Sequence, residues 1–189
     1  QEIGMTNIPI TDINDYEDVE VHGFYKDLVL DKKVLSYDEF IKACNEEARD
    51  NNRTPIQWDN SINAGWNKGM TPWLKINPNY TNINVENQIN DPNSILNFYK
   101  KLIELRKNKE YIETFVYGKF DSYLEDKENI FVYTRTGNKK VLVCTNMKGN
   151  VEKVKLPFYI KNTLLSNYNK VYIDNEITLE PYESFILEV

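Results

Sequence analysis

The sequence predicts an α+β fold in which a helix-and-loop half precedes an all-β antiparallel sandwich. Three observations support this prediction: helix-type spacing of apolar residues before residue 110, a tryptophan-rich loop within that half, and short β-type runs after it. With 189 residues, 41% of them hydrophobic, the chain is long and apolar enough to bury a core. We therefore expect two domains, residues 1–110 and residues 111–189.

Two helices are expected before the loop. Apolar residues recur at intervals of three and four from about Glu17 to Asp31, which is the pattern of an amphipathic helix. Ser36 and Glu39 have the spacing of a capping box, in which each side chain bonds to the backbone N–H of the other residue. The helix that they begin presents one apolar face, made of Phe40, Ile41, Cys44 and Ala48.

A third helix is expected after the loop. Asp91 is placed to cap it, and Pro92 then occupies the first helical position, where the missing N–H costs nothing. Cations crowd its C-terminal end, which suits the helix dipole. Its buried stripe is predicted to consist of Ile95, Phe98, Leu102 and Leu105.

The loop between the second and third helices runs from Arg49 to Trp73 and holds all three tryptophans. Pro and Gly break it too often for one helix or strand, and it is too aromatic for a solvated linker. Long ordered loops of this kind usually carry function. The alternative is a loop stapled by tryptophan packing, in which Arg49 and Arg53 hold backbone carbonyls. The pattern alone favours neither interpretation.

Short β-type runs follow residue 110 and are separated by turn signals rich in Gly, Asn and Asp. Their spacing of about 8 to 12 residues, together with enrichment in Thr, Val, Tyr and Ile, indicates an antiparallel sandwich. The expected strands are Tyr111–Tyr117, Lys119–Glu125, Ile130–Thr136, Lys140–Asn146, Val151–Leu156, Thr163–Ser166, Lys170–Ile173, Ile177–Leu179 and Ser184–Val189.

Charge and composition argue against several classes of protein. A net charge of −6 and a pI near 5.0 argue against nucleic acid or an anionic membrane as a partner. No apolar run reaches the roughly 18 residues that a membrane span needs, and the N-terminus lacks the pattern of a secretory signal. We therefore expect a cytoplasmic protein without membrane contact.

The sequence does not indicate metal or cofactor chemistry. Cys44 and Cys144 lie far apart and have no metal-ligand spacing, so buried free thiols are favoured over a disulfide. The single histidine, His22, is expected to be packed or at the surface rather than catalytic. We predict no metal site and no cofactor.

Motifs along nearly the whole chain resemble those of one family. They are Gln1–Asn7, Asp18–Glu20, Arg49–Asp59, Asn63–Gly65, Asn77–Tyr80, Ile83–Val85, Asp91–Ser94 and Leu105–Lys107. On these residues the chain resembles the oligo-1,6-glucosidase (isomaltase) branch of the α-amylase superfamily of glycoside hydrolases. Trehalose-6-phosphate hydrolases, α-1,4-glucosidases and sucrose isomerases are close relatives within that branch.

The resemblance implies where the family's chemistry lies. Retaining glycosidases need two carboxylates, and in this family the nucleophilic Asp, the acid/base Glu and a stabilising Asp follow the fourth, fifth and seventh strands of a (β/α)8 barrel. The match at Gln1–Asn7 begins just past the eighth strand. Residues 1–110 are therefore expected to be the helix-and-loop remnant of the end of the barrel, and residues 111–189 the C-terminal β-sandwich domain. We expect no catalytic residue in this C-terminal fragment, which would be inactive alone.

The resemblance also implies two substrate-binding residues. Arg53 matches a family arginine near the −1 glucose, where a guanidinium can fork hydrogen bonds to hydroxyls and keep a carboxylate ionised. Glu20 matches an acidic residue that lines the +1 side. The alternatives are an Arg53 that only anchors its loop and a Glu20 that is a solvated carboxylate at a helix start. Arg49 and Asp50 are expected to brace the loop, and the tryptophans to pack it against the barrel.

We therefore expect the C-terminal portion of an intracellular α-glucosidase that hydrolyses α-1,6-glucosidic bonds in isomalto-oligosaccharides with retention. Its partner is an α-glucoside oligosaccharide, bound by the intact parent. The alternatives are a non-catalytic carbohydrate-binding β-sandwich that uses exposed aromatic rings, or part of a trehalose-6-phosphate hydrolase or sucrose isomerase. Self-association through the barrel-facing surface is also expected, because exposed apolar patches promote it.

Overall fold

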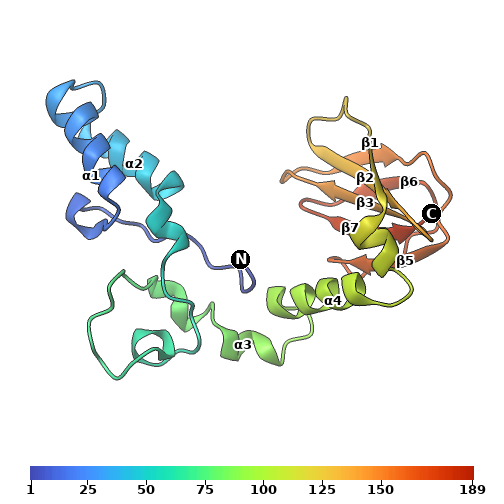
Figure 1. Cartoon of the computed structure of the whole chain (residues 1–189), viewed down its shortest axis with the longest axis horizontal. Helices are drawn as coiled ribbons and strands as arrows, with labels where there is room; N and C mark the ends of the chain where they lie inside the picture. The colour runs from blue at the N-terminus through green and yellow to red at the C-terminus, as the bar shows by residue number, and fades with distance from the viewer. The chain divides into compact units, whose positions relative to one another are not determined.

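The computed structural model describes all residues, 1–189, and the chain forms two compact units, residues 1–97 and residues 98–189 (Figure 1). Each unit has a hydrophobic core of its own. Helix α4 (Ile95–Lys107) begins in the first unit and continues in the second. The domain boundary that the sequence places at residue 110 stays a prediction. None of the helices combines the length and the apolarity that a membrane span requires.

The first unit consists of short helices joined by long ordered loops. Its elements are η1 (Ile13–Asp15), α1 (Val19–Phe24), the π-helix η2 (Tyr25–Asp31), α2 (Tyr37–Glu47), η3 (Arg49–Asn52), η4 (Ile62–Gly65), η5 (Pro78–Thr81), α3 (Val85–Ile89) and the start of α4. One buried cluster joins the N-terminal segment to α1 and α2, and it consists of Ile8, Ile10, Ile13, Tyr16, Val21, Phe40, Ile41 and Ala48.

Both helices expected before the loop are present. The helix predicted over Glu17–Asp31 corresponds to α1 and η2, which follow one another without a break, although the second part has π-helical geometry. The capping box at the start of α2 is confirmed: Ser36 Oγ accepts from the amide of Glu39 at 3.3 Å, and the Glu39 carboxylate accepts from the amide of Ser36 at 2.9 Å. Local sequence therefore determines where α2 begins.

Buried side-chain amides hold the loop after η3, together with a contact between two tryptophans. The side chains of Trp58, Trp66 and Trp73 are between 45% and 70% exposed. Gln57 is fully buried, and its side-chain amide donates to the carbonyl of Ile83 and to Asn79 Oδ1. The Asn77 amide similarly donates to the carbonyl of Thr6 at 3.0 Å, and the Asn84 amide to that of Tyr80 at 2.8 Å. The tryptophans contribute as well, because the ring centroids of Trp58 and Trp66 lie 6.3 Å apart and Trp66 Nε1 donates to the carbonyl of Ile56 at 2.6 Å.

Helix α4 begins later than the sequence suggests. The predicted cap, Asp91, instead closes a turn in which its carboxylate accepts from the amide of Asn93 at 2.9 Å. Ser94 caps the helix, because its Oγ accepts from the amide of Asn97 at 3.2 Å. The predicted stripe is only partly buried, and Ile95 is 48% exposed. Its other three residues, Phe98, Leu102 and Leu105, line a cavity of about 330 Å³ with side chains of the sheet.

The second unit is an antiparallel β-sandwich, as predicted. A five-stranded sheet has the order β1 (Lys119–Tyr123), β2 (Ile130–Thr136), β3 (Lys140–Asn146), β7 (Ser184–Glu188), β5 (Asn162–Ser166), and a two-stranded sheet pairs β4 (Glu152–Lys155) with β6 (Glu176–Leu179) (Figure 1). The buried core is Ile130, Val132, Leu142, Cys144, Val154, Leu156, Tyr172, Ile177, Leu179, Phe185, Leu187 and Val189.

Two of the expected strands are absent, for identifiable reasons. Residues 111–117 carry the π-helix η6 (Glu113–Tyr117), because the buried Thr114 exchanges hydrogen bonds with Lys139 in the β2–β3 turn. Residues 170–173 are not a strand, because the amide of Tyr172 donates to Thr163 Oγ1 at 2.9 Å instead of to a sheet partner. Tertiary bonds from single side chains override the alternating pattern at both places.

Candidate functional site

The candidate site is built around Asp18, which lies at the N-cap of α1 with its side chain only 3% exposed. Its Oδ1 accepts from the amide of Glu20 at 3.0 Å, as an N-cap carboxylate should. The backbone N–H of Asp18 donates in turn to Asp50 Oδ2 at 3.0 Å, and so does that of Glu17 at 2.7 Å. The start of α1 and the turn η3 are therefore joined by two buried carboxylates.

Arg49 forms a two-point hydrogen-bonded fork on Asp18. Its Nε lies 2.7 Å from Asp18 Oδ2 and its Nη2 lies 2.8 Å from Oδ1. Arg49 Nη2 also lies 3.0 Å from Glu20 Oε2. The hydrogen bond from Arg49, with that from the amide of Glu20, lowers the pKa of Asp18 from 3.8 to about 2. Asp18 is therefore ionised throughout the neutral range, and Arg49 braces the loop as predicted.

Arg53 lies beside the same carboxylates but is bound differently. Its Nη1 lies 3.8 Å from Asp18 Oδ2 and 3.7 Å from Asp50 Oδ1, which are ion-pair distances beyond hydrogen-bond length. Asp50 Oδ1 is buried and accepts no hydrogen bond. The guanidinium of Arg53, 44% exposed, is thus held by charge while its N–H groups stay available. It does not hold backbone carbonyls, which was the alternative considered from the sequence.

The structure brings the two sequence-predicted site residues, Arg53 and Glu20, to one cluster. Both are ion-paired within the group formed by Asp18, Asp50 and Arg49. The Glu20 side chain is 62% exposed and makes its ion pair with Arg49 alone. The sequence pointed to the exposed members of this cluster, whereas the central position of Asp18 was missed. Its place directly before an amphipathic helix is the signal that could have identified it as a cap.

A groove adjoins the cluster. It encloses about 380 Å³ between α1, η2 and α2, and the polar side chains Asp18, Glu20 and Arg49 stand at its rim. The rest of its lining is largely apolar and consists of Val21, Phe24, Leu28, Leu35, Phe40, Ala43, Cys44, Glu47 and Ala48. Charged groups on one side and apolar groups on the other suit an amphipathic ligand or a covering protein surface.

The histidine and the two cysteines form no further candidate site. The ring of His22 is hydrogen-bonded through Nε2 to the carbonyl of Tyr16 at 2.7 Å. Both cysteines are free, with Cys144 buried and Cys44 half-buried. No three His, Cys, Asp or Glu side chains come together in a geometry that would hold a metal ion.

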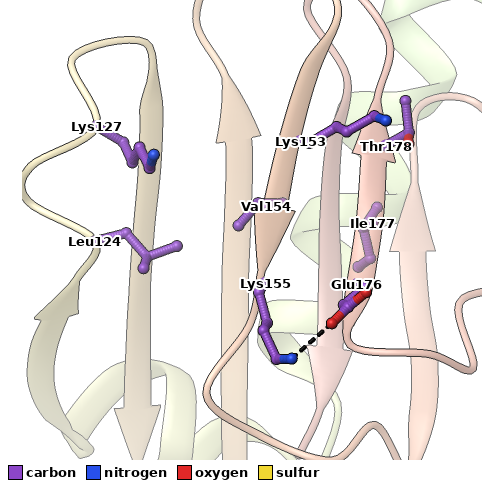
Figure 2. A pocket seen from close by; sticks show the side chains of 8 residues that line it. All are labelled: Leu124, Lys127, Lys153, Val154, Lys155, Glu176, Ile177 and Thr178. Atoms are coloured by element: carbon purple, nitrogen blue, oxygen red, sulfur yellow. Dashed lines mark hydrogen bonds and ion pairs between the residues drawn. The ribbon is translucent and has the colours of Figure 1, made fainter.

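A second hollow lies in the sandwich and encloses about 530 Å³ (Figure 2). It is lined by Leu124, Lys127, Lys153, Val154, Lys155, Glu176, Ile177 and Thr178. Its only carboxylate, Glu176, is paired with Lys155 at 2.6 Å. Neither of the sequence-predicted site residues, Arg53 and Glu20, lines this hollow, so the cluster around Asp18 is the better candidate.

Comparison with known proteins places this cluster in a family. Residues 1–115 match the model of the α-amylase catalytic domain, and residues 130–186 match that of the α-amylase SusG C-terminal domain. The chain belongs to the α-amylase family. The whole candidate site lies within the part that matches the catalytic domain.

The resemblance to oligo-1,6-glucosidases that the sequence motifs indicated is confirmed by comparison with known proteins. The chain is 42% identical to the oligo-1,6-glucosidase of Parageobacillus thermoglucosidasius, with 100% of this chain and 34% of that protein covered. It is 43% identical to the probable oligo-1,6-glucosidase 2 of Bacillus subtilis, covering 97% of this chain and 33% of that one. The chain thus spans about a third of the length of these relatives.

Solved structures of related enzymes are similar to this chain over almost its whole length. The isomaltulose synthase of Erwinia rhapontici, in complex with sucrose, matches with a TM-score of 0.89 and 42% identity over 99% of this chain and 34% of its own. The trehalose-6-phosphate hydrolase of Bacillus licheniformis matches with a TM-score of 0.86 and 36% identity over 99% and 34%. The fold expected from the sequence, the end of a barrel followed by a β-sandwich, is therefore confirmed.

Proposed function

We propose that this chain is the C-terminal portion of an α-glucosidase that hydrolyses α-1,6-glucosidic bonds in isomalto-oligosaccharides. The two relatives compared above are named oligo-1,6-glucosidase or probable oligo-1,6-glucosidase, at 42% and 43% identity. Within the chain, the proposal assigns substrate binding to Arg53 and Glu20. The catalytic carboxylates belong to the rest of the parent protein, so the chain alone does not hydrolyse glucosides.

The observation that carries the substrate role is the contrast between the two arginines of the loop. The N–H groups of Arg49 are already paired with the carboxylates of Asp18 and Glu20, at 2.7 to 3.0 Å. Arg53 is held near Asp18 and Asp50 by charge, at 3.7 to 3.8 Å. A guanidinium that is oriented but not hydrogen-bonded can donate two parallel bonds to vicinal hydroxyls of a sugar. Arg53 therefore acts as the donor to the −1 glucose, and Asp18 and Asp50 fix its position.

Substitution of Arg53 in the full-length parent tests this role. Arg53→Ala should reduce kcat/KM for isomaltose by about 1–3 kcal/mol of transition-state stabilisation, which is the cost of a lost charged hydrogen bond. Lys26→Ala is the matched control, because Lys26 is an exposed cation of the same unit paired only with Asp31. Unchanged kinetics together with a lowered melting temperature would make Arg53 a loop anchor instead.

The solved structures favour a second enzymatic candidate, in which the parent isomerises sucrose or hydrolyses trehalose 6-phosphate. The isomaltulose synthase and trehalose-6-phosphate hydrolase match this chain at 42% and 36% identity. Turnover of isomaltose, sucrose and trehalose 6-phosphate by the full-length parent separates these activities. Preference for either of the last two would overturn the proposal of an α-1,6-glucosidase.

A non-enzymatic candidate uses the sheet as a carbohydrate-binding surface. Phe120, Phe131 and Tyr133 form one cluster, with ring centroids 5.2 and 5.4 Å apart, and the two phenylalanines are each 49% exposed. Exposed rings stack readily on the apolar faces of sugars. The rings are inclined by 29° and 46°, so they do not form the flat row that suits a glucan. Titration of the chain with dextran tests this function, and loss of binding in Phe120→Ala would support it.

A further inference from the structure

We propose that a pocket beside β1 and β2 of the sandwich binds a phosphoryl group through two arginines, Arg106 and Arg135. The pocket encloses about 320 Å³, a volume that suits a small ligand. Its lining consists of Arg106, Phe115, Val116, Phe120, Tyr133 and Arg135. All of these residues belong to the second unit, so the inference does not depend on the proposed roles of Arg53 and Glu20 in the first unit.

The two arginines of this pocket lack the carboxylate partners that the other two arginines of the chain have. Arg49 and Arg53 are both ion-paired with Asp18. No carboxylate lines the pocket, and Arg106 and Arg135 donate to backbone carbonyls instead of forming ion pairs. The chain has 29 acidic and 23 basic side chains, so acids are not scarce. The positive charge of the pocket is therefore left for an anion from solution to balance.

Carbonyls of the π-helix η6 hold both guanidiniums at the pocket. Arg106 Nη1 donates to the carbonyl of Phe115 at 3.3 Å, and Arg135 Nη2 donates to that of Val116 at 3.2 Å. These carbonyls belong to consecutive residues, so they bring the two cationic groups close together. A guanidinium has five N–H donors, and these bonds use one on each arginine. Most of the donors therefore stay available to a ligand.

The guanidinium of Arg135 has lost part of its hydration without full compensation. Its Nε is buried and has no hydrogen-bond partner in the chain. Arg135 is fixed there by its position in the sheet, directly opposite Phe120 in the pairing of β1 with β2. A poorly hydrated cation attracts an anion more strongly than a fully hydrated one, because the surroundings screen the charge less. An anion in the pocket would therefore offset the cost of burying Arg135.

The pocket suits a phosphoryl group better than a carboxylate. One guanidinium fork pairs with one carboxylate, whereas a phosphoryl group has three acceptor oxygens and up to two negative charges, which match two guanidiniums. The rings of Phe120 and Tyr133, with centroids 5.2 Å apart, stand on the same face of the sheet as Arg135. They offer an apolar wall to whatever the phosphoryl group is attached to. Inorganic phosphate and a sugar phosphate are the two sources to distinguish.

The alternative is that both arginines only cap η6, since cations often bond to the last carbonyls of a helix. A cap stabilises the chain but binds no anion, so the decisive measurement is binding rather than stability. Calorimetric titration of the chain with inorganic phosphate, glucose 6-phosphate, glucose and acetate provides it. Both phosphates should bind, and glucose and acetate should not. Tighter binding of glucose 6-phosphate than of inorganic phosphate identifies a sugar phosphate as the ligand, and the reverse order or equal affinity identifies free phosphate.

Substitution of each arginine identifies the site of binding. Arg106→Gln and Arg135→Gln should each weaken phosphate binding at least about tenfold, because each removes a charge and its hydrogen bonds. Lys119→Gln is the matched control, because Lys119 is an exposed cation of β1 that is paired with Asp121 and does not line the pocket. The affinity of this control should equal that of the unaltered chain. Absence of phosphate binding, or equal weakening in Lys119→Gln, would overturn the inference.

A measurement on the unaltered chain covers the case in which an arginine variant does not fold. Phenylglyoxal modifies accessible guanidiniums, and mass spectrometry of peptides identifies the modified residues. Inorganic phosphate should slow the modification of Arg106 and Arg135 in the chain and in the full-length parent. Arg53, which is 44% exposed and lies in the first unit, is the internal control and should react at an unchanged rate. Equal protection of Arg53, or no protection of Arg106 and Arg135 in either protein, would contradict a phosphoryl site in this pocket.

Discussion

Arg49 and Asp18 form a two-point hydrogen-bonded pair, although 31 positions separate them in the sequence. The pair ties the N-cap of α1 to the turn that follows α2, and Asp50 reinforces it from the other side through the amide of Asp18. The substrate-facing residues of the proposed site, Arg53 and Glu20, are each charge-paired to this group. Stability and the proposed binding role therefore depend on the same carboxylate.

The first prediction is a pH dependence of stability that resides in Asp18. Its pKa is lowered from 3.8 to about 2 by the hydrogen bond from Arg49. A depressed pKa in the folded state contributes stability above the unfolded value, and that contribution is lost as pH falls from about 4 to about 2. Melting temperatures of the chain across this range should fall more steeply than those of Asp18→Asn, whose side chain still caps α1.

Asp38→Asn is the control for this experiment, because Asp38 is an exposed carboxylate in the first turn of α2. Its profile should run parallel to that of the unaltered chain. If Asp18→Asn instead follows the unaltered chain between pH 2 and 4, Arg49 does not stabilise the ionised Asp18 in solution.

The second prediction concerns a buried carboxylate in the sandwich. Glu183 is fully buried and accepts hydrogen bonds from Tyr172 Oη, from Lys170 Nζ at 2.9 Å and from the amide of Glu180 at 2.6 Å. Tyr172→Phe removes one donor to a buried charge, so the free energy of unfolding should decrease by about 1–3 kcal/mol. Urea denaturation of both proteins measures this difference in the free energy of unfolding.

Tyr159→Phe is the matched control for Tyr172→Phe, because Tyr159 is 90% exposed. Its denaturation midpoint should equal that of the unaltered chain. A Tyr172→Phe midpoint that is also unchanged would show that water replaces the lost donor to Glu183.

The elements that the sequence predicts well are those whose signals are local. Ser36 and Glu39 are three residues apart, and their reciprocal bonds form as predicted. The bounds of β2 and β3 match the predicted runs because polar turns flank segments rich in β-branched and aromatic residues. The α-amylase family and its oligo-1,6-glucosidase relatives were predicted from motifs and are confirmed.

The predictions from sequence fail where contacts with distant residues determine the local structure. The π-helix η6 forms because the buried Thr114 bonds to Lys139, a partner 25 positions away. The fork between Arg49 and Asp18 joins two segments whose proximity no local pattern encodes. The sequence identified Arg53 and Glu20 through family resemblance, and their substrate roles stay predictions.

A third prediction is that the purified chain hydrolyses neither isomaltose nor a nitrophenyl α-glucoside. The two carboxylates that a retaining glycosidase needs are expected in the rest of the parent protein. Incubation at high protein concentration with product detection tests this expectation. Turnover on the order of 1–1000 per second that copurifies with the chain would contradict it.

The last prediction is that the two units differ in independence. Strands β2, β3 and β7 pair along their whole lengths over a shared core, so their amides should exchange most slowly with deuterated water. The first unit exposes large apolar side chains on α1, with Val19 79% and Phe24 56% exposed. Surfaces of this kind promote self-association. Its amides should therefore exchange quickly in dilute samples and become protected as the protein concentration rises.

Sedimentation velocity, measured together with hydrogen exchange, distinguishes the monomer from the self-associated chain. The double variant Val19→Ser, Phe24→Ser should shift the chain toward monomer, because it removes apolar area from the proposed contact surface. Tyr159→Ser, a change at an exposed ring of the second unit, should leave association unchanged. Slow exchange across residues 1–90 in a strictly monomeric sample would show that the first unit folds stably without a covering partner.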